Sequence, residues 1–229
     1  MTRTARITLP LALLALAACD RGDGEASARP APTDGAPAAP APAAVHSWRS
    51  TPGGGVTVSA AGDSLRVETG PHAILWDAAA PELAPPYTLR ARMQKHAGRL
   101  HEGYGLLFGG SGLEGPEAGQ VYSYFLVRGD GSFLVKRRQG AETPVVRDWT
   151  AHPAIRRDGE SGGRPNELEV RVGEAEAVFL VNGAEVARVP AAELSVRGRA
   201  GLRAAHEITL SVDGFRAEPG APAAPGGPR

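Results

Sequence analysis

The sequence is poor in cysteine, aromatic side chains and net charge, and each shortage excludes a class of protein. A single cysteine among 229 residues excludes an internal disulfide framework and any zinc site built from several cysteines. The 25 basic and 25 acidic side chains leave no basic excess, which argues against a nucleic-acid-binding protein. Aromatic residues make up only 5% of the chain, but a hydrophobic content of 42% is enough for one core.

The N-terminus is typical of an export signal. Two arginines precede a mostly apolar run over residues 7–18, which is shorter than the roughly 20 residues that a membrane-spanning helix needs. The run ends in LAAC at residues 16–19, which resembles the lipobox of bacterial lipoproteins. That resemblance implies removal of the signal before Cys19, acylation of Cys19 and anchoring in the bacterial cell envelope. The alternative is an ordinary secretion signal that happens to contain a cysteine.

Composition divides the rest of the chain. Residues 20–44 hold nine alanines and five prolines and almost no large apolar side chain, so they cannot form a core and are expected to act as an extended spacer. The C-terminal end repeats this composition. We therefore expect a signal peptide over residues 1–18, a lipidated cysteine with its linker over 19–44, one folded domain over 45–217 and a disordered tail over 218–229.

The folded domain has a β pattern throughout. Leu168, Val170 and Val172 alternate with charged residues, which is the period-two pattern of a half-buried strand. Asn182-Gly183 between two apolar runs predicts a type I′ hairpin. One helical turn is expected over residues 191–194. The other segments give about eleven strands and predict an all-β antiparallel sandwich or jelly roll. The predicted strands cover residues 56–59, 64–69, 87–94, 104–108, 121–127, 132–136, 167–172, 178–181, 185–189, 200–204 and 208–212.

Several motifs, in their order along the chain, resemble a concanavalin A-like lectin or glucanase sandwich. They include GYGLLFGG at residues 103–110, YSYFLVRGDG at 122–131, VNG at 181–183 and DGF at 213–215. The match is nearest to the DUF1080 group, also called 3-keto-disaccharide hydrolase-like, and covers roughly residues 48–217. The resemblance implies a concanavalin A-like jelly roll. Its motifs are mostly structural, so no catalytic residue is carried over.

Motifs for catalysis or metal binding are absent from the sequence. A glycosidase of this architecture needs two carboxylates about 5 to 9 Å apart, and the alternating acids that laminarinase-like enzymes place on one strand do not occur. Glu167 and Glu169 would share a face, but their alternation with apolar residues favours a solvated one. The six histidines form no HxH or HExxH motif, so we predict no metal site and no cofactor. A structural calcium ion remains open, because its backbone and scattered acidic ligands leave little trace in a sequence.

Ligand binding has more support in the sequence than catalysis. Sugars are recognised by aromatic faces combined with planar polar groups in a hollow. Tyr122, Tyr124 and Arg128 share one phase of a predicted strand, and further candidates come from neighbouring segments. The alternative is that the tyrosines pack in the core or at a sheet edge. The candidate ligand-binding residues are Tyr104, Tyr122, Tyr124, Arg128, Arg137 and Trp149.

These observations favour a lipid-anchored, non-catalytic module that binds glycan or another envelope ligand. Its expected partners are a membrane, through the lipid on Cys19, and a carbohydrate, but not nucleic acid. Two alternatives stay open. One is a glycoside-cleaving enzyme, which the 3-keto-disaccharide hydrolase-like resemblance implies. The other is a structural or accessory lipoprotein with a protein partner.

Overall fold

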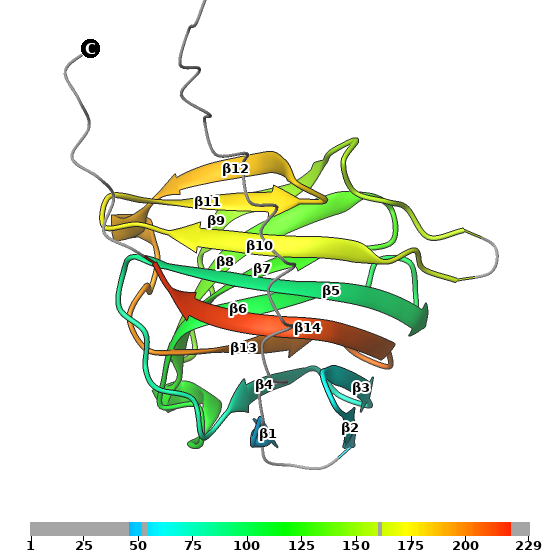
Figure 1. The fold of residues 1–229 in the computed structure, drawn as a ribbon, viewed down its shortest axis with the longest axis horizontal. Coiled ribbons are helices and arrows are strands. Elements are labelled where there is room, and N and C mark those ends of the chain that lie inside the picture. The colour runs from blue at the N-terminus through cyan, green and yellow to red at the C-terminus, as the bar shows by residue number, and fades with distance from the viewer. Residues whose placement is uncertain (1–45, 52–54, 160–161, 221–229) are drawn as a thin grey trace, which may run out of the picture. The chain divides into compact units, whose positions relative to one another are not determined.

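The computed structural model describes residues 46–51, 55–159 and 162–220, which form two antiparallel sheets of seven strands each (Figure 1). In spatial order, sheet A consists of β1 (Trp48–Ser50), β4 (Ala73–Asp77), β13 (Arg199–Ala204), β6 (Tyr104–Ser111), β7 (Val121–Val127), β8 (Ser132–Gln139) and β9 (Val145–Ala151). Sheet B consists of β12 (Ala184–Pro190), β11 (Glu176–Val181), β10 (Asn166–Val172), β5 (Tyr87–Ala97), β14 (Thr209–Pro219), β3 (Ser64–Thr69) and β2 (Val56–Ala61). The described residues contain no α-helix, only the 3-10 turns η1 (Glu117–Gly119) and η2 (Ala191–Glu193), which confirms the predicted all-β sandwich.

All eleven predicted strands are present, and three further strands were not predicted. β4 is short and buried on both faces, so it has no alternation that would mark it as a strand. β9 is an edge strand whose side chains are mostly exposed, and β1 pairs only with β4. β4 has five residues, whereas β6 and β7, which were predicted from continuous apolar runs, have eight and seven.

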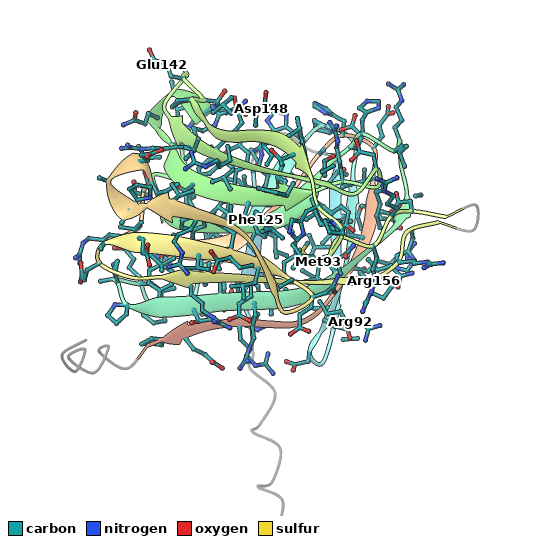
Figure 2. All side chains as sticks on the ribbon, turned by 90° about the horizontal axis from the view of Figure 1, so that it is seen from above. Arg92, Met93, Phe125, Glu142, Asp148 and Arg156 are labelled. Carbon is teal, nitrogen blue, oxygen red and sulfur yellow. The ribbon has the colours of Figure 1, made fainter. Side chains whose placement is uncertain are left out.

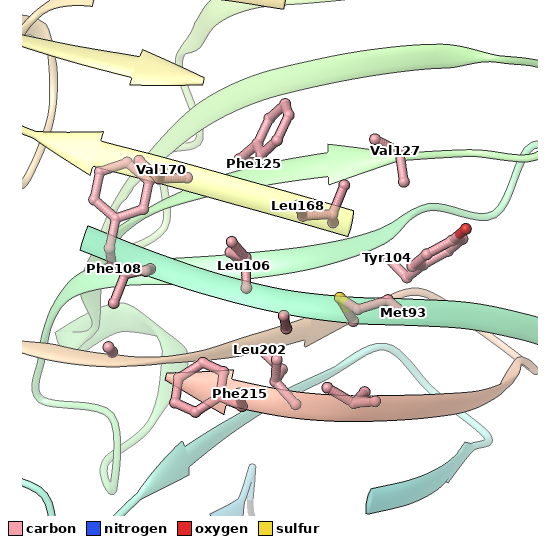
Figure 3. Close-up of a cluster of buried hydrophobic side chains, with 14 of the residues drawn as sticks. Met93, Tyr104, Leu106, Phe108, Phe125, Val127, Leu168, Val170, Leu202 and Phe215 are labelled. Carbon is pink, nitrogen blue, oxygen red and sulfur yellow. The ribbon is translucent and has the colours of Figure 1, made fainter. Parts of the chain in front are cut away.

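The core lies between the two sheets (Figure 3). Phe108 and Phe125 of sheet A meet Phe179 of sheet B, with ring centroids 6.1 and 5.1 Å from that of Phe179. Figure 2 shows Phe125 and Met93 between the sheets, whereas Arg92 and Asp148 lie on opposite outer sides. Burying each such apolar side chain contributes about 1.5–3 kcal/mol to folding, so this shared core fixes which phase of each strand faces inward.

The predicted hairpin turn between β11 and β12 is also confirmed. Asn182 and Gly183 have φ angles of 51° and 81°, the positive values that a type I′ turn requires at both central residues. The Asn182 side chain fixes this turn to the sheet, because its Nδ2 donates to Asn166 Oδ1 at 2.8 Å and to the Ala154 carbonyl at 2.7 Å.

The structure extends the C-terminal boundary of the sandwich. β14 continues to Pro219, so two residues that the sequence analysis gave to the tail belong to sheet B. The register of β14 against β5 shifts between Asp213 and Arg216. This irregularity interrupts the alternation of apolar and polar residues, so the sequence pattern did not predict that the strand continues. The predicted signal peptide, Cys19, the linker and residues 221–229 lie outside the described residues. No helix in the described part is long and apolar enough to cross a membrane.

Candidate functional site

The outer face of sheet A carries a second cluster of apolar and aromatic side chains. Along β7, Phe125 and Val127 point into the core, so Tyr122, Tyr124 and Leu126 point outward. Cross-strand register places Lys136 opposite Tyr124 and adds side chains from four neighbouring strands. The buried members of the cluster are Ile74, Trp76, Leu107, Leu113, Tyr122, Tyr124, Leu126 and Leu134, and the half-buried Trp149 packs against them.

Two arginines cover the tyrosines of this cluster. The hydroxyl of Tyr122 accepts hydrogen bonds from Arg138 Nε at 3.1 Å and from Arg203 Nη1 at 3.0 Å. The Arg203 guanidinium also lies 4.8 Å from the ring centroid of Tyr124. Tyr122 and Tyr124 are consequently only 1% and 4% exposed, and burial raises the pKa of the Tyr124 hydroxyl. The guanidinium groups form a cationic layer over aromatic rings.

A third arginine pairs with the tryptophan of the edge strand. The Arg128 guanidinium lies 4.3 Å from the ring centroid of Trp149. The indole rests on Gly103, where an added Cβ would lie 3.0 Å from Trp149 Cη2, so a larger residue there would displace the ring. Asp130 forms an ion pair with Arg128 at 2.7 Å. Burial acts to raise the pKa of Asp130, but hydrogen bonds from Arg128 and Ser132 outweigh it and hold the pKa below its usual range.

These six side chains form what we call the aromatic–arginine face. It consists of Tyr122, Tyr124, Trp149, Arg128, Arg138 and Arg203. Tyr122 and Tyr124 are buried beneath arginines, so Trp149 is the partly exposed ring of this face, and the three guanidinium groups offer planar arrays of donors. Such a combination can bind a ligand that has both an apolar face and hydrogen-bond acceptors.

The loop between β6 and β7 folds onto this face, and we call its residues 112–120 the flap. Leu113 packs into the outer cluster, and Gln120 Nε2 donates to the carbonyls of Leu113 at 3.3 Å and Gly115 at 3.0 Å. Glu117, at the start of η1, is held by His72 Nε2 at 2.9 Å and by Arg138 at 3.4 Å. The hydrogen bond from His72, supported by the charges of Arg138 and Arg203, holds the pKa of Glu117 below its usual range.

A hollow of about 390 Å³ lies beside the flap. Trp76 lines it, and within the described structure the Trp76 indole Nε1 is buried without a hydrogen-bond partner. Arg199 lines it as well and donates to the carbonyls of Ala78 at 3.2 Å and Ala80 at 3.1 Å. The hollow therefore offers space next to the aromatic–arginine face.

The structure gathers four of the six predicted ligand-binding residues and separates the other two. Tyr122, Tyr124, Arg128 and Trp149 lie on the aromatic–arginine face. Tyr104 lies in the core between the sheets, where burial raises its pKa to about 12 (Figure 3). Arg137 has the opposite phase to Arg138, and its Nε donates to Ser195 Oγ at 3.2 Å. Neither residue is in the outer cluster, so we base no binding role on either.

Four charged side chains at this face were not among the predicted binding residues. Arg138 and Lys136 could have been found from the register of the β7–β8 hairpin, which pairs them with Tyr122 and Tyr124. Arg203 could not be placed in this way, because its strand β13 pairs with β6, which is distant in the sequence. Glu117 could not be placed either, because it lies in a loop whose residues follow no repeating pattern. As to metal binding, no set of three or more His, Cys, Asp or Glu residues in the described ranges is placed to hold an ion.

Comparison with known proteins shows the fold but no family. No family model and no curated protein matches the sequence. Among solved structures, carbohydrate-binding module CBM66 from Bacillus subtilis has a TM-score of 0.59 and 11% identity, covering 75% of this chain and 94% of its own. A Bacillus subtilis protein of unknown function with a galectin-like fold has a TM-score of 0.56 and 13% identity, covering 75% and 88%. The Emp47p carbohydrate recognition domain has a TM-score of 0.52 and 12% identity, covering 76% and 89%.

Those three structures establish that this chain has a lectin-like β-sandwich fold, as the resemblance to concanavalin A-like domains implied. At such identities the likeness concerns the fold alone, because one sandwich architecture carries many functions. The function has to be argued from the aromatic–arginine face.

Proposed function

We propose that this chain is a lipid-anchored, non-catalytic module of the cell envelope that binds glycan on the aromatic–arginine face. One observation carries the proposal: three aromatic rings and three guanidinium groups meet on the outer face of one sheet. Sugar rings present C–H faces, which can pack on the partly exposed Trp149 ring, and hydroxyl groups, which can accept hydrogen bonds from guanidinium donors. The names of two structural neighbours, a carbohydrate-binding module and a carbohydrate recognition domain, support this choice of ligand class.

Trp149 is the best residue with which to test the site. It is half-buried on an edge strand, so its ring is accessible to a ligand and its removal should leave the fold intact. We expect the full chain to bind on a glycan array and Trp149→Ala to weaken that binding about ten-fold or more, since stacking and hot-spot aromatic contacts are worth roughly 1–3 kcal/mol.

The matched control is Arg171→Ala on the outer face of sheet B, where the side chain is exposed. Binding that survives Trp149→Ala, or that Arg171→Ala abolishes, would place the site elsewhere. The proposal as a whole would be contradicted if the protein bound no glycan on the array and no added sugar changed its thermal stability.

The anchor and the absence of catalysis are tested separately. We expect Cys19→Ala to move the protein out of the membrane fraction, because several acyl chains on one cysteine would supply the attachment. Incubation with ordinary and 3-keto disaccharides should give no product. Turnover that a single Glu or Asp substitution abolishes would instead support the glycoside-cleaving alternative, and a protein captured by crosslinking in native membranes would support the accessory-subunit alternative.

A further inference from the structure

The charges around Tyr122 and Tyr124 are unbalanced. Arg138, Arg203 and Lys136 all lie on this side of sheet A. Glu117 supplies the carboxylate that pairs with Arg138, and neither Lys136 nor Arg203 forms an ion pair with any carboxylate in the described part of the chain. Placing cations side by side costs free energy unless an anion compensates them, so the face has unused capacity for negative charge.

Glu117 reaches this face on a segment that is weakly packed. None of the residues of η1 is buried, and the Glu117 side chain is itself 48% exposed. The flap begins at Gly112, whose φ of +65° and whose contact with the Gly119 carbonyl leave no room for a Cβ. Its apolar attachment comes from Leu113. Displacing Glu117 from Arg138 would therefore cost little buried apolar area.

We infer that the glycan bound at this face is acidic, and that its carboxylate takes the position beside Arg138 and Arg203 that Glu117 occupies in the free protein. This inference rests on the proposed function, and it narrows the ligand class from glycans in general to glycans that carry carboxylate groups. The planar guanidinium group matches a carboxylate better than it matches a hydroxyl, because two parallel charge-assisted hydrogen bonds can form. Glu117 acts as an internal competitor that keeps the cationic layer paired until a ligand arrives.

The test compares two probes that differ only in charge. Binding of the full chain to oligogalacturonate and to the same oligomer with every carboxylate methyl-esterified is measured by calorimetry at low ionic strength, with a chelator present. We expect the acidic oligomer to bind about ten-fold more tightly, since hydrogen bonds to charged groups contribute more than neutral ones. The preference should decline as salt is added.

Glu117→Gln tests the competition directly. It keeps the shape of the side chain but removes its charge, so affinity for the acidic oligomer should rise several-fold more than affinity for the ester. Glu169→Gln, which removes an acid from the outer face of sheet B, is the matched control and should change neither affinity. Lys136→Gln should reduce the preference for the acidic oligomer.

The outcomes separate this inference from the proposed function. Equal affinity for both oligomers, or no effect of Glu117→Gln, overturns the inference and leaves glycan binding in place. The inference is also overturned if an oligosaccharide that carries sulfate groups but no carboxylates binds more tightly than oligogalacturonate. The anion recognised at this face would then be a sulfate. Failure to bind any glycan on the array refutes both.

Discussion

The two outer faces of this sandwich are built on the same strand geometry but differ in what covers them. On sheet B, β3 and β10 alternate between buried and largely exposed residues, and the exposed ones form ion pairs such as Arg66–Glu68. On sheet A, nearly every residue of β6 and β7 is buried on both faces, because arginines and the flap cover the outer side chains. A sandwich needs only its inner faces to be dry. The second buried layer, with arginines stacked on its rings, is therefore more than the sandwich itself requires.

Trp76→Ala should have the largest effect and would test whether the outer face of sheet A is a true second core. Trp76 is 1% exposed in the outer cluster, so its truncation should lower the free energy of unfolding by about 3–5 kcal/mol. Arg171→Ala on sheet B should change it by less than about 0.5 kcal/mol. The free energies of unfolding of both variants and the wild type are measured by urea denaturation. Similar losses in the two variants would remove the distinction between the faces.

Tyr122→Phe should have an intermediate effect. The variant keeps the ring but removes the hydroxyl that accepts hydrogen bonds from Arg138 and Arg203. Arg138 is only 7% exposed, so its unpaired donor should cost about 1–3 kcal/mol. The comparison is Ser64→Ala on sheet B, which breaks an exposed hydrogen bond to Asp213 and should cost well under 1 kcal/mol. A smaller loss for Tyr122→Phe than for Ser64→Ala would mean that water replaces the hydroxyl under the arginines.

The same contrast explains what the sequence could predict. Alternation identifies β3, β5 and β10 because one side of each strand faces solvent, and it correctly assigns Leu168 and Val170 to the core. On β7 apolar and polar residues do not alternate, because both sides of the strand are buried. The sequence therefore predicts a central strand but not which side of the sheet each tyrosine faces. Tyr104 and Tyr122 are equally buried, one on each side of sheet A, and only strand pairing distinguishes them.

The flap should respond to acid in a direction set by Glu117. Its pKa is lowered in the fold by the hydrogen bond from His72, with Arg138 and Arg203 adding. The stabilisation is therefore fully present above the unfolded pKa of about 4.3 and is lost as the pH falls through the lower folded pKa. Because Glu117 is half-exposed, the free energy of unfolding of the wild type should exceed that of Glu117→Gln by less than about 1 kcal/mol at neutral pH, and this difference should shrink as the pH falls below the unfolded pKa. A difference that widens in acid would show that Glu117 is not held as an anion.

The smallest expected difference is between two ion pairs, one from each outer face. Arg66 and Glu68 on sheet B are 56% and 51% exposed, so a double-mutant cycle should give a coupling free energy close to zero. Arg128 and Asp130, in the turn between β7 and β8 of sheet A, are 22% and 32% exposed, and Arg128 is also held against Trp149, so their coupling should reach about 0.5–1 kcal/mol. Trp149→Ala should reduce the second coupling and leave the first unchanged, because stacking on the indole orients the guanidinium toward Asp130. Equal couplings would mean that Trp149 does not organise its arginine, and the aromatic–arginine face would then end at Tyr124.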